Sequence, residues 1–368
     1  MKVCILSMHR VDNMGSLLQS FALKTIIEKL GNEVEFIDIT KRNEDNELLR
    51  GYKQEYHEER ETTGLIGKIK KIDRFTLNRL KIKKKNLEQS NAFEDFRKSQ
   101  LGIEKRSPEY DVCVIGSDEV FNCLNSGAWG FTSQLFGNVP EADKVITYAA
   151  SCGSTKYEEL PTRVADRIRQ SFEKVTAFST RDKNTHEFVA KLTGKQITDN
   201  LDPVLVYDFD QEVKQATLPK MPERSCVVYS YYNRVHTANE IDAINEFCKK
   251  HQLTPLAIGA PQFWIKDYVI CSPFQCLKIF ANADFVITDT FHGTIFASKY
   301  ASRFAVLVRE SNRNKLADLV EKIGMQDHLM DNITEMVEKY KISKNQGKFR
   351  TIIEDEQIKT WQYLKDNI

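Results

Sequence analysis

The sequence contains no apolar run long enough to cross a lipid bilayer. A spanning helix needs roughly 18 or more consecutive apolar residues, and no window of this chain approaches that length. The opening residues, MKVCILSMHR, turn polar after a short apolar stretch, so we expect no secretion signal. These absences predict a cytoplasmic protein that does not span a membrane.

Signatures of common metal and dinucleotide sites are also missing. The eight cysteines form no CxxC pair, which disfavours a thiolate metal site. Several of them stand inside apolar, strand-like runs, where a thiol usually acts as a small buried hydrophobe. No GxGxxG is present, which disfavours a nicotinamide site. We therefore expect neither a metal nor a bound cofactor.

An excess of charge of one sign is missing as well. The 53 lysines and arginines nearly balance the 52 aspartates and glutamates, and the formal net charge at pH 7 is +1. We therefore expect no strong overall field that attracts nucleic acid. The composition, with 41% hydrophobic and 29% charged residues, is typical of a folded globular protein. A length of 368 residues leaves room for two domains.

Strand and helix patterns alternate along most of the chain. Residues 2–39 predict a strand, a helix and a parallel second strand. The alternation resumes at Tyr110 and, after the proline-containing stretch 208–224, begins again at Cys226. This pattern predicts an α/β fold of two Rossmann-like domains that face each other across a cleft. We expect an N-terminal domain over 1–207, a C-terminal domain over 225–340 and a helical tail over 341–368.

The segment 41–107 departs from this pattern. It is rich in Lys, Arg and Glu, and within it KIKKIDRFTLNRLKIKKKN is strongly basic with apolar residues at roughly helical intervals. This composition is typical of an exposed, amphipathic helical insertion. The alternative is a cationic surface that contacts an anionic lipid headgroup or a diphosphate carrier. In that case the protein would be peripheral at the inner face of the membrane.

The most informative stretch is ADFVITDTFHGTIFAS at 283–298. A short buried strand, a polar turn and an apolar run at helical spacing follow one another, and open α/β sheets place ligands at such junctions. The helix start offers unpaired N–H groups and a positive dipole end to an anionic ligand. His292 in this turn carries a proton that can move near neutral pH. The alternative is a capped helix start with an incidental histidine.

Motifs spread over both predicted domains form a recognisable combination. They are NMGSLLQSFAL at 13–23, YDVCVIGSDEVFN at 110–122, TYAASCG at 147–153, FSTRDKNTHEFV at 178–189, LDPVLV at 201–206, ADFVITDTFHGTIFAS at 283–298 and VRESNRNKLADLVEKIGM at 308–325. In this order the chain resembles the polysaccharide pyruvyl transferases. The resemblance implies a fold like that of GT-B glycosyltransferases. It also implies transfer of pyruvate from phosphoenolpyruvate to two hydroxyls of one sugar, which gives a cyclic ketal.

Such a donor sets requirements for the site. Phosphoenolpyruvate carries a phosphate and a carboxylate, so its site needs cations and backbone donors. The reaction also needs a general acid to protonate the methylene carbon. The resemblance points to His292 as this acid, with Thr290 and Gly293 beside it in the donor site. Some family members have an arginine two residues before the histidine, where this chain has Thr290, so one expected anion ligand is missing.

Three arginines are candidates for binding the donor. The family pattern favours Arg181 in the turn STRD, whereas its alternative role is an ion pair with Asp182 or another acid. Arg309 and Arg313 flank the turn after the predicted strand RFAVLV, and a guanidinium fork can reach an anion from a neighbouring loop. They would replace the arginine missing at Thr290. The alternative is that both are solvated.

Polar residues at two further junctions predict the acceptor site. Ser117 and Asp118 end a strand, and Asp118 would accept a proton from the acceptor hydroxyl or hydrogen-bond the sugar; the alternative role is to cap a helix. Asn13 and Gly15 open the first helix, where glycine permits close approach of a ligand; the alternative is a plain turn. Two more residues are expected to line the same cleft: Asn122 and Trp129.

The sequence therefore predicts a pyruvyl transferase of surface polysaccharide biosynthesis, as in exopolysaccharide or capsule formation. Its expected partners are phosphoenolpyruvate and a glycan or lipid-linked oligosaccharide, with the 4- and 6-hydroxyls of galactose as the favoured acceptor. Two alternatives stay open. One is a GT-B glycosyltransferase that uses a nucleotide sugar, and the other is a non-catalytic glycan-assembly protein of the same fold.

Overall fold

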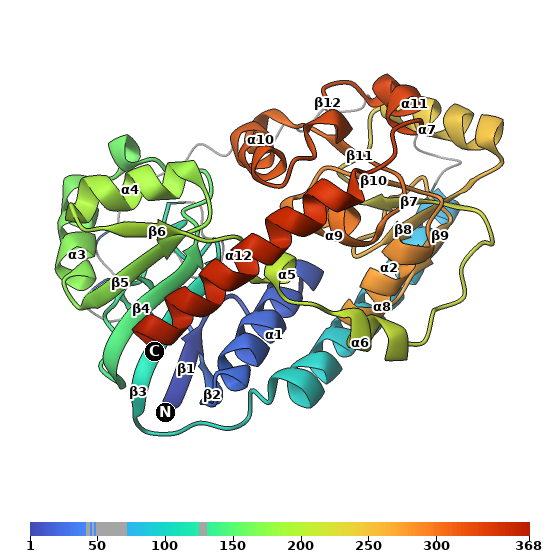
Figure 1. The fold of residues 1–368 in the computed structure, drawn as a ribbon. Coiled ribbons are helices and arrows are strands. Elements are labelled where there is room, and N and C mark those ends of the chain that lie inside the picture. The colour runs from blue at the N-terminus through green and yellow to red at the C-terminus, as the bar shows by residue number, and fades with distance from the viewer. Residues whose placement is uncertain (42–44, 46–47, 49–71, 125–130) are drawn as a thin grey trace.

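The described part of the chain forms two parallel β-sheets with helices around them (Figure 1). This computed structural model describes residues 1–41, 45, 48, 72–124 and 131–368. The predicted basic segment is therefore described chiefly from Ile72 onward, and Trp129 lies outside the described residues. Within those ranges, no helix combines the length and the apolar composition that crossing a membrane requires.

The N-terminal sheet has the strand order β2-β1-β3-β4-β5-β6, and all neighbouring strands are parallel. Its central strands are buried on both faces, as expected where helices cover both sides of a parallel sheet. The strands are β1 (Lys2–Leu6), β2 (Glu33–Ile37), β3 (Tyr110–Asp118), β4 (Ala142–Ala150), β5 (Val175–Thr180) and β6 (Ile197–Asp199). The helices are α1 (Met14–Lys29), α2 (Ile72–Phe96), α3 (Thr162–Phe172), α4 (Lys183–Thr193) and α5 (Pro203–Val206).

The C-terminal sheet has the order β12-β11-β10-β7-β8-β9 and is also parallel. Helix α6 (Asp210–Gln215) lies in the connection between the sheets. The strands are β7 (Ser225–Tyr229), β8 (Thr254–Ile258), β9 (Asp267–Val269), β10 (Phe285–Thr288), β11 (Phe304–Leu307) and β12 (Leu329–Met330). The helices are α7 (Ala238–His251), α8 (Pro273–Asn282), α9 (Phe291–Tyr300), α10 (Arg313–Lys322), α11 (Met336–Lys339) and α12 (Gln346–Asn367).

The second half of α2 connects the two halves of the molecule, whereas the sequence suggested an exposed helix. Gln89 exchanges two hydrogen bonds with the backbone of Cys271, at 2.8 and 3.2 Å. The Nζ of Lys85 donates to the carbonyl oxygen of Tyr268 at 2.8 Å. Just beyond α2, the buried Arg97 donates to the turn that follows β1. This part of the segment thus ties the first strand-to-helix turn to the C-terminal half.

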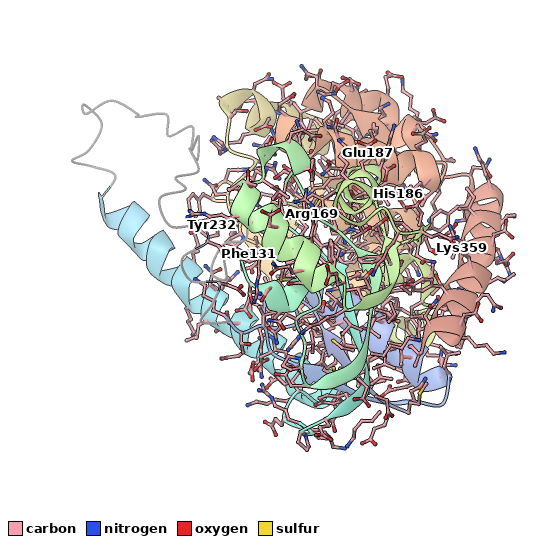
Figure 2. The ribbon with its side chains drawn as sticks, turned by 90° about the vertical axis from the view of Figure 1, so that its left-hand side faces the viewer. Phe131, Arg169, His186, Glu187, Tyr232 and Lys359 are labelled. Atoms are coloured by element: carbon pink, nitrogen blue, oxygen red, sulfur yellow. The ribbon has the colours of Figure 1, made fainter. Side chains whose placement is uncertain are left out.

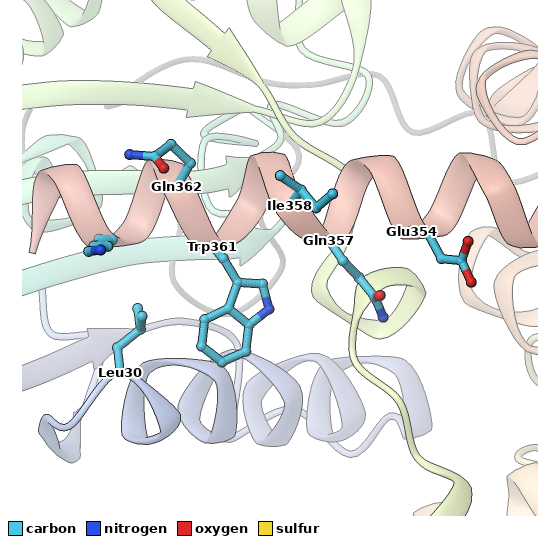
Figure 3. Close-up of a pocket in the computed structure, with 7 residues that line it drawn as sticks. Leu30, Glu354, Gln357, Ile358, Trp361 and Gln362 are labelled. Carbon is cyan, nitrogen blue, oxygen red and sulfur yellow. The ribbon is translucent and has the colours of Figure 1, made fainter.

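Helix α12 crosses from the C-terminal half back to the N-terminal sheet, as the long red helix in Figure 1 shows. The hydroxyl of Tyr363 donates to the carbonyl oxygen of Thr147 at 2.7 Å, and Tyr148 and Thr360 share a hydrogen bond of 3.0 Å. Trp361 points from α12 toward α1 and lines a groove of about 530 Å³ (Figure 3). Helix α12, although it ends the chain, therefore packs against the N-terminal sheet.

Removal of the Tyr363 hydroxyl should weaken the attachment of α12. We expect Tyr363→Phe to lower the free energy of unfolding by about 1 kcal/mol, because a buried hydrogen bond is lost while the ring packing is kept. Urea denaturation followed by circular dichroism measures this change. Tyr232→Phe, on a half-exposed ring, is the control and should leave the midpoint unchanged. Equal effects in both variants would contradict the attachment.

Candidate active site

The chain order of the strands reverses between β1 and β3 in one sheet and between β7 and β10 in the other. Ligands of open α/β sheets bind beyond the carboxyl ends of the strands at such points. Asp118 ends β3, and His292 lies in the first turn of α9, directly after β10. Gly15, at the start of α1, touches the ring of His292. The ligand-binding edges of the two sheets therefore meet at one place.

The start of α9 is built so that His292 occupies its first turn. Thr290 is the N-cap, and its Oγ1 accepts the backbone N–H of Gly293 at 3.0 Å. A Cβ added at Gly293 would lie 2.1 Å from the Oγ1 of Thr288, so a larger residue would disturb this turn. Thr290 and Gly293 therefore shape the helix start, and donor binding by them stays a prediction.

The imidazole of His292 is held by residues of the N-terminal half. A Cβ added at Gly15 would lie 2.1 Å from its Nδ1 and 2.2 Å from its Cγ, so α1 packs on the ring through a glycine. Nε2 lies 3.5 Å from the Oδ2 of Asp202. Nε2 is nevertheless buried without a hydrogen-bond partner among the described residues. Such a nitrogen is a group that a bound ligand would satisfy.

The sequence did not single out Asp202, yet His292 and Arg181 converge on its carboxylate. Asp202 is fully buried, and its Oδ2 accepts from the NH1 of Arg181 at 2.9 Å. Burial acts to raise the pKa of Asp202, but the interactions with His292 and Arg181 outweigh it and hold the pKa below its ordinary value. Asp202 is therefore ionised at neutral pH. Its place before a proline, as the N-cap of α5, is the signal that the sequence offered.

Arg181 follows the carboxyl end of β5 and is buried. Besides the bond to Asp202, its NH2 lies 3.8 Å from the Oδ1 of Asp118. The guanidinium carbon lies 4.2 Å from the centroid of the Phe291 ring, which is a cation–π contact. Its Nε has no hydrogen-bond partner among the described residues. The ion pair that the sequence offered as the alternative role of Arg181 is therefore present, with Asp202 and not with Asp182, which caps α4.

Ser117 and Asp118 are the last two residues of β3, and both contact side chains of α1. The Oγ of Ser16 donates to the Oδ2 of Asp118 at 2.7 Å. Asp118 has a φ of 79°, a left-handed conformation that is uncommon outside glycine. Ser117 is fully buried and donates to the Oε1 of Gln19 at 2.6 Å. The chain continues from Asp118 into a turn, so helix capping is not the role of either residue.

The two predicted acceptor-site asparagines hold neighbouring groups in place. Asn13 is the N-cap of α1, and its Oδ1 accepts the N–H of Gly15 at 2.7 Å. Asn122 donates to the Oε2 of Glu119 at 2.7 Å, and the Oε1 of Glu119 pairs with the Nζ of Lys315 at 2.6 Å. Burial acts to raise the pKa of Glu119, but Lys315 outweighs it and holds the pKa below its ordinary value. Acceptor binding by both asparagines stays a prediction.

Arginines from two loops approach Asp289, which follows β10. The Nε of Arg309 donates to the Oδ2 of Asp289 at 3.0 Å, and its NH1 donates to Glu240. The NH2 of Arg309 is buried and has no hydrogen-bond partner among the described residues. The sequence missed Arg234, whose Nε lies 3.6 Å from the same carboxylate oxygen. Arg313 is about half exposed and pairs with an exposed acid at 2.8 Å. Arg309 and Arg234 are therefore better placed than Arg313 to serve this site.

A cleft of about 690 Å³ runs between the two halves beside these residues. One wall includes residues from 153–156 and the start of α4, and the other consists of residues from 310–321, with α10. The Nζ of Lys322 on α10 donates to the carbonyl oxygen of Arg181 at 2.8 Å, so the walls are in contact at the cluster.

The fold is of the GT-B type, as the sequence predicted. The UDP-GlcNAc 2-epimerase of Methanocaldococcus jannaschii aligns with a TM-score of 0.50 at 10% identity, over 98% of this chain and 100% of that one. The UDP-N-acetylglucosamine 2-epimerase of Rickettsia bellii aligns with a TM-score of 0.48 at 10% identity, over 99% of this chain and 96% of that one. A Streptomyces glycosyltransferase, in complex with thymidine diphosphate, aligns with a TM-score of 0.45 at 10% identity, over 99% of this chain and 98% of that one. At these identities the likeness concerns the fold alone.

The family model of the polysaccharide pyruvyl transferases matches residues 13–311. The chain therefore belongs to this family, which confirms the resemblance seen in the motifs. The matched range includes both Asn13 and His292, and therefore the ligand-binding edges of both sheets. The protein is thus a transferase that acts in the pyruvylation of polysaccharides. None of the curated proteins matches the chain.

The contact between Gly15 and His292 yields a test of the site. We expect Gly15→Ala to lower kcat by about 100-fold, because the new methyl group must displace the imidazole and small misplacements of a reacting group are costly. The matched control is Gly347→Ala, at the same position of another helix, where the new methyl group would meet only the Oδ1 of Asn345, at an ordinary contact distance of 3.9 Å. Wild-type kcat in Gly15→Ala, or an equal loss in both variants, would contradict the placement of His292.

Proposed function

We propose that the protein transfers pyruvate from phosphoenolpyruvate to two hydroxyls of one sugar in a polysaccharide repeat unit, giving a cyclic ketal. The observation that carries this proposal is the buried, unpartnered Nε2 of His292 beside Asp202 and Arg181, at the junction of the two halves. A proton donor and a guanidinium group stand side by side there. This is the pairing that an enol ester with two anionic groups requires.

Donor binding is assigned to the guanidinium groups of Arg181, which is buried, and Arg309, which is partly buried. The Nε of Arg181 and the NH2 of Arg309 lack hydrogen-bond partners among the described residues, so both can donate to phosphate or carboxylate oxygens. The N-terminus of α9 adds a positive dipole end beside His292. Arg309 and Arg234 would supply the charge that the family arginine provides at the position of Thr290. The reaction as proposed consumes only donor and acceptor and needs no further cofactor.

The chemistry would proceed in two additions to the same carbon. His292 gives a proton to the methylene carbon, which becomes a methyl group, while the first sugar oxygen bonds to the enol carbon. Asp118, oriented by Ser16, accepts the proton of that hydroxyl. The second hydroxyl then replaces the phosphate at this carbon, and its proton leaves with the phosphate. Asp118 releases its proton to solvent and His292 regains one from solvent, which restores the enzyme. The products are one ketal and one inorganic phosphate.

The acceptor that we propose is a glycan or lipid-linked oligosaccharide, with the 4- and 6-hydroxyls of galactose as the first pair to examine. Such an acceptor would place the enzyme in the cytoplasm, at the inner face of the membrane, and in exopolysaccharide or capsule formation. The basic segment supports this location. Lys84 on α2, for example, is 80% exposed.

Loss of the His292 imidazole should slow turnover strongly. We expect His292→Ala to lower phosphate release from phosphoenolpyruvate and acceptor by about 10²–10⁴-fold, the usual contribution of a general acid. A coupled phosphate assay with galactose-containing acceptors measures this loss. The control is His186→Ala, because His186 lies on the surface of α4 and pairs with Asp199 (Figure 2).

Two outcomes would contradict the proposal. One is phosphate release in His292→Ala at the rate of the control variant. The other is thermal stabilisation of the wild-type protein by UDP- or GDP-sugars but not by phosphoenolpyruvate, which would favour a glycosyltransferase that uses a nucleotide sugar.

A further inference from the structure

Exposed aromatic rings gather on two loops of the C-terminal half. Tyr231 and Tyr232 follow β7 and are 49% and 54% exposed, and Phe263 follows β8 and is 46% exposed. Large rings facing solvent together are unusual on a protein surface and mark a place of contact. Tyr232 is labelled in Figure 2, toward the edge of the molecule where α2 lies.

The two loops are fixed to each other by hydrogen bonds. The N–H of Asn233 donates to the carbonyl oxygen of Pro261 at 3.0 Å, and the N–H of Phe263 donates to the Oδ1 of Asn233 at 3.2 Å. The side chain of Gln262 donates to the carbonyl oxygen of Tyr231 at 2.9 Å and accepts from the N–H of Val235 at 3.1 Å. The rings therefore stand on a rigid base, and binding to them costs little ordering of the loops.

The rings also have a defined arrangement. Tyr232 and Phe263 meet edge to face, with centroids 5.4 Å apart at an angle of 90°. The guanidinium carbon of Arg234 lies 5.4 Å from the centroid of Tyr231. These geometries are the favourable ones for aromatic pairs and for a cation over a ring. Tyr232 and Phe263 thus form one surface, and Tyr231 precedes Tyr232 in the chain; the three residues are called here the aromatic platform.

The aromatic platform is continuous with the candidate active site. Ser230, directly before it, donates to the Oδ1 of Asp289 at 2.6 Å. Arg234, whose guanidinium carbon lies 5.4 Å from the centroid of the Tyr231 ring, has its Nε 3.6 Å from the Oδ2 of the same Asp289. The hydroxyl of Tyr231 can donate a hydrogen bond. The platform therefore begins at the reacting centre and extends away from it.

A sugar chain is the occupant that fits these features. The faces of pyranose rings present C–H groups that pack against aromatic rings, while their hydroxyls bond to polar groups such as the Tyr231 hydroxyl. The acceptors of this family are polysaccharides, and the repeat unit must continue beyond the sugar that reacts. A platform next to the reacting centre is where those further sugars would lie.

We propose that Tyr232 and Phe263, with Tyr231 at the inner end, stack against acceptor sugars that flank the one receiving pyruvate. This inference rests on the proposed function and adds a subsite that selects extended acceptors over single sugars. Because the contact is made away from the reacting atoms, it contributes to acceptor binding and leaves the chemical step unchanged.

Kinetics with acceptors of two lengths test the platform. We expect Tyr232→Ala combined with Phe263→Ala to raise the acceptor KM about five- to tenfold for an oligosaccharide of three or more sugars, the range for loss of stacking contacts. The KM for a methyl galactoside, the KM for phosphoenolpyruvate and kcat should not change. The control is Ile358→Ala, on a residue of α12 that is 71% exposed. An unchanged oligosaccharide KM, or an equal rise for both acceptors, would overturn the proposal.

Direct binding separates this inference from the proposed function. Calorimetric titration of the oligosaccharide in the absence of phosphoenolpyruvate reports on the platform alone, and the double variant should bind about five- to tenfold more weakly. If that weakening is seen in a protein that releases no phosphate, the platform stands and the proposed reaction fails. Binding of anionic phosphatidylglycerol vesicles that is lost in the double variant, with oligosaccharide binding intact, would overturn the platform as a glycan site.

Discussion

The structure depends on a buried negative charge. The carboxylate of Asp202 is fully removed from solvent, and an ion in such a place is tolerated only when cations and hydrogen bonds compensate it. Arg181 from the N-terminal half and His292 from the C-terminal half both face it. The same interaction therefore favours docking of the two halves and sets the imidazole beside the guanidinium group. The same contacts thus join the two halves and place the two groups of the proposed donor site side by side.

Helix α5 carries this interaction, although it is only a single turn long. At its start Asp202 faces His292 of α9, and at its end Lys299 of the same α9 donates to the carbonyl oxygens of Val204 and Leu205, both at 2.9 Å. Burial lowers the pKa of Lys299 to about 8. Both ends of α5 are thus held by α9. Since the chain passes from α5 into the connection between the sheets, this clamp fixes the C-terminal half where the two halves join.

Much of the fold and part of the candidate site could be predicted from the sequence, for physical reasons. Apolar strands and helical spacing predict a parallel α/β fold because each element must bury its own face. The TDTFHG turn predicts that His292 lies at a strand end, where open α/β sheets bind ligands, and the structure places it there; its catalytic role stays a prediction. Asp202 and Arg234 were missed, since their importance comes from partners far away in the chain. The same holds for the second half of α2, whose basic surface suggested exposure while Gln89 is buried against Cys271.

The most direct test of the account is a crystal structure of the protein with phosphoenolpyruvate. The account predicts the donor between the two halves, with an anionic group within hydrogen-bond distance of the Nε of Arg181 and the methylene carbon facing the Nε2 of His292. A donor bound elsewhere, with both of these nitrogens still lacking a partner, would contradict it.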